Sequence, residues 1–299
     1  MISRSTILKQ MLNGLMRRYQ ERVPDVQAII NAMVAEEIIQ KPEDIDNDHI
    51  AFRTLGVPNL GIPSIEKIFL HLGYEKRDSY NFPEKKLNAY WYSPPEEFLP
   101  RIFISELRVN ELSENAQQII RKYTNQIESD PVDKLDMNNP VALDHFMHGG
   151  LWPIPTLSEY SRLRDESEYA AWVIYNRYYL NHFTISIHNL KEGYNTIPLF
   201  NSFLEKNGFK LNDAGGKIKT SADGLLHQIA TVAHMIDATF AEGDVHPIPG
   251  SYVEFAERKM LPQFEGQGNE YSNRSLRREG FEAANANRIF ESTYRSQTE

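Results

Sequence analysis

The strongest constraint on the fold is an internal repeat. Two short segments, 48–53 and 181–186, each open with a polar residue and a histidine and then alternate in the manner of a half-buried strand. An amphipathic helix follows each strand and stops at a glycine, Gly73 in the first copy and Gly208 in the second. Since one copy must pack against the other, the chain is predicted to be organised around a metal site where the two modules face each other.

The repeat divides the chain into modules and helical additions. In both copies the pattern predicts a strand, a helix and then several further strands, which indicates an α+β protein. We predict a single catalytic domain over residues 1–299. Its parts in order are N-terminal helices at 5–45, the first module at 46–110, a helical insertion at 111–180, the second module at 181–258 and a polar, helical C-terminal tail at 259–299.

The composition excludes several classes of protein. The 299 residues contain no cysteine, so disulfides, thiolate metal sites and a cysteine nucleophile are excluded. A formal charge of -9 does not favour nucleic acid as a partner. The sequence has neither a long apolar run nor a secretory signal pattern, so we expect a cytoplasmic protein without membrane contact. Nothing in the sequence indicates an oligomeric state.

Three side chains from the two modules form a candidate metal site. His49 and His182 occupy the same place in the two repeated strands, and Glu254 lies on the final, alternating strand of the second module. Two imidazoles and one carboxylate are typical of non-haem Fe(II) enzymes, because they leave coordination positions open for substrate and O2. We therefore predict that these three residues bind the metal.

A small set of polar residues around this site is predicted to bind substrate. Arg53 lies on the same strand face as His49, and its guanidinium can pair with a carboxylate through two parallel hydrogen bonds. We therefore assign Arg53 both a catalytic and a substrate-binding role. Arg258 stands in the same relation to Glu254 and is a second anchor or a partner for that carboxylate. The remaining predicted substrate contacts are Ser221 and Gln228.

Other residues offer rival sites. His145 and His148 are three residues apart and could share a helix face as a metal pair, although the two glycines that follow them favour a helix end or a turn. Asp244 and His246 lie in a predicted loop at 244–250 and have no third ligand indicated by spacing. Glu106, near the end of the first module, is interpreted as the counterpart of Glu254 and hence as a fourth ligand or a supporting group.

At these residues the chain resembles a known family. The segments DHIAFRTLG (48–56), ESEYAAWVIYNRYYLNHFTISI (166–187), SADGLLHQIATVA (221–233) and GSYVEFAER (250–258) are similar to those of 2-oxoadipate dioxygenase/decarboxylases. The resemblance implies a fold like that of the vicinal-oxygen-chelate proteins, with paired βαβββ modules forming a curved mixed sheet around the metal. It also implies chemistry related to that of hydroxyphenylpyruvate dioxygenase and hydroxymandelate synthase.

The resemblance further implies the cofactor and the reaction. The cofactor would be Fe(II), held by His49, His182 and Glu254, with Arg53 on the substrate carboxylate. The partners would be a small 2-oxo dicarboxylic acid and O2. The expected conversion is that of 2-oxoadipate, or a similar 2-oxo acid, and O2 into 2-hydroxyglutarate and CO2. The 2-oxo acid would chelate the iron through its C1 carboxylate and its keto oxygen.

Two other functions fit the same residues. One is a hydrolase or isomerase that uses Zn(II) or Mn(II) on this scaffold and needs no O2. The other is a protein that binds an acidic metabolite without catalysis. Nucleotide-dependent, serine-hydrolase and zincin chemistry have no support, because the sequence lacks their phosphate loops, G-x-S-x-G turns and H-E-x-x-H helices.

Overall fold

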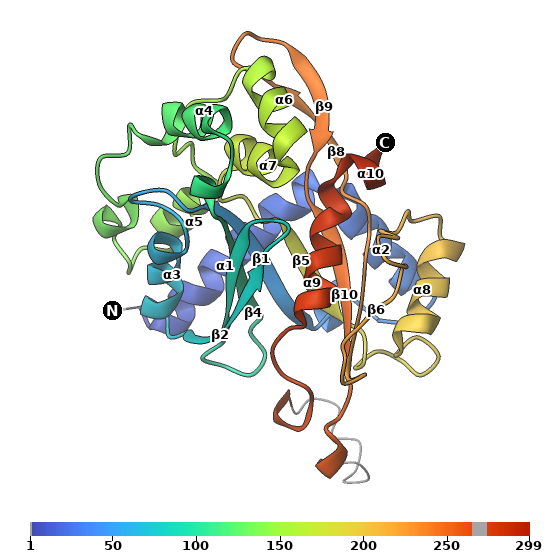
Figure 1. The fold of residues 1–299 in the computed structure, drawn as a ribbon. Coiled ribbons are helices and arrows are strands. Elements are labelled where there is room, and N and C mark those ends of the chain that lie inside the picture. Colours follow the sequence, from blue (N-terminus) through green and yellow to red (C-terminus); the bar gives the residue numbers. More distant parts are fainter. Residues whose placement is uncertain (1, 265–273) are drawn as a thin grey trace.

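A curved mixed sheet of eight strands forms the centre of the molecule, in the order β2-β3-β4-β1-β5-β10-β7-β6 (Figure 1). The computed structural model describes residues 2–264 and 274–299. The strands of the sheet are β1 (Asn47–Leu55), β2 (Glu75–Phe82), β3 (Leu87–Ser93), β4 (Arg101–Leu107), β5 (His182–Ser186), β6 (Lys219–Thr220), β7 (Leu226–Ala230) and β10 (Tyr252–Arg258). A separate hairpin consists of β8 (Met235–Thr239) and β9 (Val245–Pro249).

Helices flank this sheet. The α-helices are α1 (Arg4–Arg22), α2 (Pro24–Ala35), α3 (Ile62–His71), α4 (Glu114–Thr124), α5 (Pro140–His148), α6 (Leu157–Glu166), α7 (Glu168–Asn176), α8 (Ile197–Lys206), α9 (Ala283–Ile289) and α10 (Arg295–Thr298). The short 3-10 helices are η1 (Pro42–Asp44), η2 (Val109–Glu111), η3 (Pro131–Lys134), η4 (Pro262–Phe264), η5 (Arg274–Leu276) and η6 (Phe290–Thr293). No helix in the described residues has the length and apolar character needed to span a bilayer.

The two halves of the sheet have the same topology. The first module runs β1, α3, β2, β3, β4, and the second runs β5, α8, β6, β7, β10, with the β8–β9 hairpin inserted before its last strand. In each module the first and last strands are parallel neighbours, and β1 and β5 join the two modules as an antiparallel pair. The predicted α+β fold of paired βαβββ modules is therefore confirmed.

The helix of each module begins in the same way. Both α3 and α8 open with an Ile-Pro pair, and proline suits the first turn because its missing N–H would have no intrahelical partner there. A carboxylate from the last strand of the same module then accepts the first backbone N–H. Glu106 accepts from Ile62 and Glu257 accepts from Ile197, each at 2.8 Å. The helix start and the last strand are thus fixed to each other in both copies.

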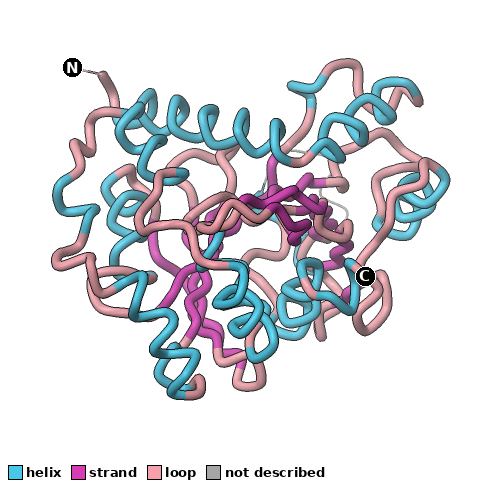
Figure 2. Tube along the Cα trace, turned by 90° about the horizontal axis from the view of Figure 1, so that it is seen from above, coloured by secondary structure: helices cyan, strands magenta, loops and turns pink. Residues whose placement is uncertain are grey.

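The two faces of the sheet have different covers. Tyr19 of α1 packs against Phe183 on one face, and its hydroxyl lies within hydrogen-bonding distance of backbone atoms of β5 and β10. The opposite face carries His49, Arg53 and His182 and is covered by α7, α9 and η6. Figure 2 shows the strands running between helices on both sides. The side chains predicted to bind the metal therefore lie in the interior, between the sheet and the C-terminal helices.

Some predicted elements differ from those observed. Strand β2 has no apolar alternation, because it is a charged edge strand with one side open to water. Residues 244–250 were predicted as a loop, but most of them form β9 of the β8–β9 hairpin. This strand has no recognisable strand pattern in the sequence, because it contains two prolines and most of its side chains are exposed. The helical stretch at 157–179 is divided into α6 and α7 at Ser167, whose side chain caps α7.

Candidate metal centre

Three buried side chains from three neighbouring strands converge on one point. His49 of β1, His182 of β5 and Glu254 of β10 each offer a ligand atom, and these atoms lie within 4.8 Å of one another. The Nε2 atoms of the two imidazoles are 3.3 Å apart, and those of His182 and His49 lie 3.2 and 3.6 Å from the Glu254 carboxylate. Two nitrogens and one carboxylate oxygen suit a divalent transition metal. The three residues are far apart in the sequence, and the pairing of β1, β5 and β10 brings them together.

The residue before each histidine fixes its ring. Asp48 lies 2.8 Å from Nδ1 of His49, and the amide oxygen of Asn181 lies 3.2 Å from Nδ1 of His182. Both oxygens can only accept a hydrogen bond, so each Nδ1 carries a proton. The Nε2 atoms are thereby left to face the common point. A hydrogen bond of this kind behind a histidine orients the ring and raises its basicity as a ligand.

The electrostatic surroundings of the two imidazoles differ. Burial alone would lower the pKa of His49, but Glu254 and Asp48 outweigh burial and raise that pKa. Burial, together with the nearby charges of His49 and Arg53, holds the pKa of His182 well below its ordinary value. Without a metal, the proton between the two rings and the carboxylate therefore belongs to His49. A cation that binds here takes the place of that proton.

A chain of amides holds the carboxylate of Glu254. Gln228 on β7 donates from Nε2 to Oε1 of Glu254 at 2.6 Å, and Asn285 on α9 donates to the amide oxygen of Gln228 at 2.9 Å. Because both amides are buried, their hydrogen bonds restrict the carboxylate to one orientation. The predicted substrate residue Gln228 thus contacts a proposed metal ligand and also lines the cavity at the site.

Two arginines hold Asp48 in its charged form. Arg258 donates from Nε and Nη2 to the carboxylate at 2.6 and 2.9 Å, and Arg101 donates from Nη1 at 3.2 Å. Burial opposes ionisation of Asp48, but these guanidinium groups outweigh it, so the pKa of the carboxyl lies well below its usual range. Arg101 also pairs with Glu279, and Arg258 donates to the carbonyl of Gly280. The C-terminal segment is therefore connected to the group that orients His49.

Arg53 lies on the same face of β1, enclosed by aromatic rings. Its guanidinium carbon is 5.1 Å from the ring centre of Tyr169 and 5.3 Å from that of Trp172. Nη1 donates to the Thr293 hydroxyl at 2.8 Å and Nη2 to the Phe290 carbonyl at 3.0 Å. Its Nε has no hydrogen-bond partner in the described part of the chain, and the same is true of the buried Tyr252 hydroxyl. The two side chains nevertheless interact with each other electrostatically.

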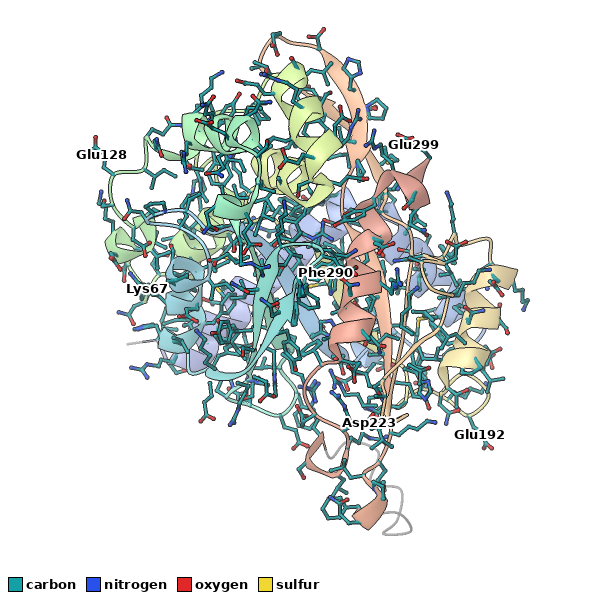
Figure 3. All side chains as sticks on the ribbon, in the orientation of Figure 1. Lys67, Glu128, Glu192, Asp223, Phe290 and Glu299 are labelled. Carbon is teal, nitrogen blue, oxygen red and sulfur yellow. The ribbon has the colours of Figure 1, made fainter. Side chains whose placement is uncertain are left out.

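A small cavity at the three ligands is lined on one side by the C-terminal cap, a name used here for residues 279–293. The cap contributes Phe281, Ala286, Ile289 and Phe290 to the cavity wall. The cavity measures about 20 Å³, which holds roughly one water molecule. Figure 3 shows Phe290 at the centre of the molecule, whereas the labelled Glu128 and Glu192 lie at its periphery. A six-carbon acid needs more room than this cavity offers, and the cap is the part of the cavity wall that lies outside the sheet.

Other predicted residues lie away from this cavity. Ser221 accepts from the backbone of Leu226 and shapes the turn between β6 and β7. Arg258 binds Asp48, not Glu254 as the sequence suggested. His145 and His148 stack edge to face at the end of α5, and no third imidazole or carboxylate joins them among the residues that the structure describes.

The interpretation of Glu106 as the counterpart of Glu254 is wrong. The pairing of the first and last strands sets His49 opposite Arg101 and His182 opposite Tyr252. Counting from these pairs, Glu106 matches Glu257, and these are the two carboxylates that cap α3 and α8. The prediction matched the two modules by residue type, a glutamate with a glutamate. Equivalent positions are instead set by the register of the paired strands.

Several residues at the site were not found from the sequence. Asp48 and Asn181 had a signal, since each is the polar residue directly before a repeated histidine. The sequence contains no signal for Arg101, because its partner Asp48 is 53 residues away. Phe281 and Phe290 also had none. They belong to the tail, where no periodic apolar pattern indicates a buried segment.

Comparison with known proteins identifies one family, since the matching family model and two similar proteins carry the same name. The family model described as 2-oxoadipate dioxygenase/decarboxylase matches residues 11–274. The chain is 40% identical to the chloroplastic 2-oxoadipate dioxygenase/decarboxylase of Arabidopsis thaliana, covering 99% of this chain and 80% of the relative. It is 42% identical to the chloroplastic/amyloplastic protein of that name from Oryza sativa subsp. japonica, covering 98% and 80%. A crystal structure of hydroxyglutarate synthase from Oryza sativa in complex with 2-oxoadipate is 41% identical, covers 99% of this chain and 94% of that chain, and superposes with a TM-score of 0.89.

These relatives correct the predicted location. Both curated relatives carry a plastid location in their names, which contradicts the cytoplasmic location expected from the sequence. That expectation depended on the lack of a long apolar run and of a secretory signal pattern. Neither feature distinguishes the cytoplasm from the interior of a plastid.

Proposed function

Because the chain belongs to the 2-oxoadipate dioxygenase/decarboxylase family, we propose that it converts 2-oxoadipate and O2 into 2-hydroxyglutarate and CO2. The atoms of this reaction balance without a further reductant, since six carbons and seven oxygens enter and leave. The observation that carries the proposal is the convergence of His49, His182 and Glu254 beside the buried Arg53.

The metal in this proposal is Fe(II), held by His49, His182 and Glu254. The donor set fits such an ion, because its three atoms are buried and close together and each side chain is oriented by a neighbour. Bound Fe(II) supplies positions for a 2-oxo acid and O2 and the redox chemistry that O2 requires. The protein keeps protons on Nδ1 of both imidazoles and keeps the carboxylate of Glu254 in place through Gln228.

Arg53 is proposed to bind the carboxylate of the substrate that lies away from the 2-oxo group. It lies on the same strand face as His49, is enclosed by Tyr169 and Trp172, and interacts with the Tyr252 hydroxyl. Its present partners are a backbone carbonyl and a hydroxyl of the cap, which a substrate carboxylate could replace with a charge-assisted pair. The role of Arg53 is binding and orientation of the substrate, not proton transfer.

The experiment is oxygen consumption by protein loaded anaerobically with Fe(II). We expect uptake with 2-oxoadipate, release of one CO2 per O2 and formation of 2-hydroxyglutarate. The matched substrate 2-oxohexanoate has the same chain without the second carboxylate. Arg53→Met should lower kcat/KM for 2-oxoadipate by roughly a hundredfold and change the value for 2-oxohexanoate little, since a buried charge pair contributes about 2–5 kcal/mol.

Other outcomes would contradict the proposal. Equal losses for both acids would mean that Arg53 acts only through the packing of the cap. Turnover of a substrate in the strict absence of O2 would favour the metal-dependent hydrolase or isomerase. Binding of 2-oxoadipate without turnover, unaffected by His49→Ala but abolished by Arg53→Met, would favour a binding protein.

A further inference from the structure

The register of β1 and β5 relates the two modules by an approximate twofold axis. In this antiparallel pair His49 lies opposite Thr184, and Ala51 lies opposite His182. Exchanging the two strands exchanges the two histidines and also exchanges Ala51 with Thr184. The equivalence of the modules therefore follows from hydrogen-bond register and does not depend on sequence similarity.

The same register identifies the first-module counterpart of Glu254. Strand β10 is parallel to β5 and places Glu254 opposite Thr184. Strand β4 is parallel to β1 and places Phe103 opposite Ala51. Since Ala51 and Thr184 are equivalent, Phe103 and Glu254 are equivalent, and both point to the same face of the sheet. A phenyl ring therefore stands where the twofold relation would place a second carboxylate.

The surroundings of Phe103 agree with this position. Its side chain lines the same small cavity as His49, His182 and Glu254 and is 5% exposed. Its ring centre lies 4.9 Å from that of Phe281, which in turn lies 4.8 Å from the His49 ring. The wall of the cavity on the side of β4 is thus apolar and supplies no donor atom for a metal.

We propose that Phe103 determines the chemistry of the site by keeping the fourth ligand position of the twofold arrangement free of protein donors. This inference rests on the metal site proposed above. Two imidazoles and one carboxylate leave three positions of an octahedron, enough for a chelating 2-oxo acid and O2 together. A carboxylate at residue 103 would take one of them, and only two would remain.

The test compares Phe103→Glu with the apolar control Phe103→Leu. Anaerobic titration with Co(II) measures metal affinity, and the d–d absorption of the bound ion reports its coordination number. Binding of 2-oxoadipate to the Co(II) protein is then followed by the change in this absorption. In Phe103→Glu we expect metal affinity to rise roughly tenfold or more, because an additional charged ligand strengthens a divalent site. We expect 2-oxoadipate still to chelate through the two remaining positions. Because no position is then left for O2, the Fe(II)-loaded variant should consume no O2 with 2-oxoadipate. Phe103→Leu should keep the metal affinity, spectrum, 2-oxoadipate binding and O2 consumption of the wild type.

The outcomes separate this inference from the metal site itself. A wild-type protein that binds no Co(II) would overturn the metal site and this inference with it. If the wild type binds Co(II) and Phe103→Glu matches it in affinity, spectrum and O2 consumption, only the role of Phe103 is overturned. The uncharged Phe103→His is the second variant in case Phe103→Glu does not fold. It offers a neutral donor at the same position and should likewise raise metal affinity and abolish O2 consumption by the Fe(II)-loaded protein, and failure to do so would overturn the inference.

Discussion

Asp48 is the residue on which the orientation of His49 depends. Its carboxylate accepts from the imidazole and is itself held by Arg258 and Arg101, so three buried charges act together on the ring of a proposed metal ligand. Burying an ionised carboxylate is unfavourable unless it is paired and hydrogen-bonded, and here it is both. The cluster therefore both stabilises the junction of the sheet with the cap and sets the tautomer of His49.

Replacing Asp48 should weaken metal binding. In Asp48→Asn the amide no longer forces the proton onto Nδ1 of His49, and we expect affinity for Co(II) to fall about 10–100-fold. Anaerobic titration measures this. The control is Glu257→Gln, a buried carboxylate on β10 that caps α8 and does not touch His49. Both variants should lose stability, but only Asp48→Asn should lose metal affinity. Equal affinities in the two variants would contradict the proposed role of Asp48.

The raised pKa of His49 predicts how metal binding depends on pH. A metal needs the neutral imidazole, so below the pKa of His49 each bound ion must displace one proton. Affinity should therefore fall roughly tenfold for each unit that the pH drops below this pKa, which lies above the ordinary value for histidine. The pKa of His182 is lowered, so this ring is neutral over the same range and adds no second proton.

Titration with Co(II) at several pH values, with proton release measured in weak buffer, tests this dependence. We expect one proton to be released per ion below the pKa of His49. In Asp48→Asn the decrease in Co(II) affinity should begin at a lower pH, because one of the groups that raises the pKa of His49 has lost its charge. Affinity that is constant from pH 8 to pH 5 would exclude a protonated His49 in the metal-free protein.

At the scale of elements, the C-terminal cap controls access to the site. It contacts the sheet side of the site through four polar connections: Glu279 with Arg101, Gly280 with Arg258, Asn285 with Gln228, and Phe290 and Thr293 with Arg53. Arg101 and Arg258 hold Asp48, which orients His49. Gln228 holds Glu254, and Arg53 is the proposed substrate anchor. Opening of the cap and loosening of the site are therefore expected to be coupled.

Hydrogen exchange of backbone amides should reveal this opening. Because the cavity holds about one water, its wall must rearrange for a 2-oxo acid to enter, and we expect the cap to be the part that opens. We expect amides of α9 and η6 to exchange faster than those of β1 and β5 in the metal-loaded, anaerobic protein. Addition of 2-oxoadipate should slow exchange in the cap and leave β1 unchanged. A cap that exchanges as slowly as the central strands, with or without ligand, would mean that substrate enters by another route.

At the same scale, periodic patterns decided which elements were predictable. Helices α3 and α8 carry amphipathic stripes because one side of each is buried. Strands β1 and β5 are buried on both faces, but their polar side chains alternate with apolar ones. All four elements were predicted within a few residues. Strand β2 and the β8–β9 hairpin are mostly exposed, so their sequences show no apolar periodicity from which they could be predicted. The cap was predicted as a polar tail, since its burial depends on a few aromatic residues spaced without a helical period.

At the scale of the whole molecule, the site exists because two similar modules share one sheet. The repeat in the sequence predicted that His49 and His182 would meet, and the β1–β5 pair brings them together. The sequence could not give the register between the first and last strands of each module. That register makes Phe103, and not Glu106, the counterpart of Glu254. Pairing between distant strands leaves no local pattern in the sequence. The two histidines could be predicted because each lies in a repeated local segment.

The central claim is that side chains from both modules hold a single ion, and its most direct test is the stoichiometry of anaerobic Fe(II) binding. Equilibrium dialysis should give one Fe(II) per wild-type chain. His49→Ala, His182→Ala and Glu254→Gln should each retain far less iron at the same free concentration while keeping the folded sheet by circular dichroism. One tightly bound Fe(II) in all three variants, or none in the wild type, would contradict the account.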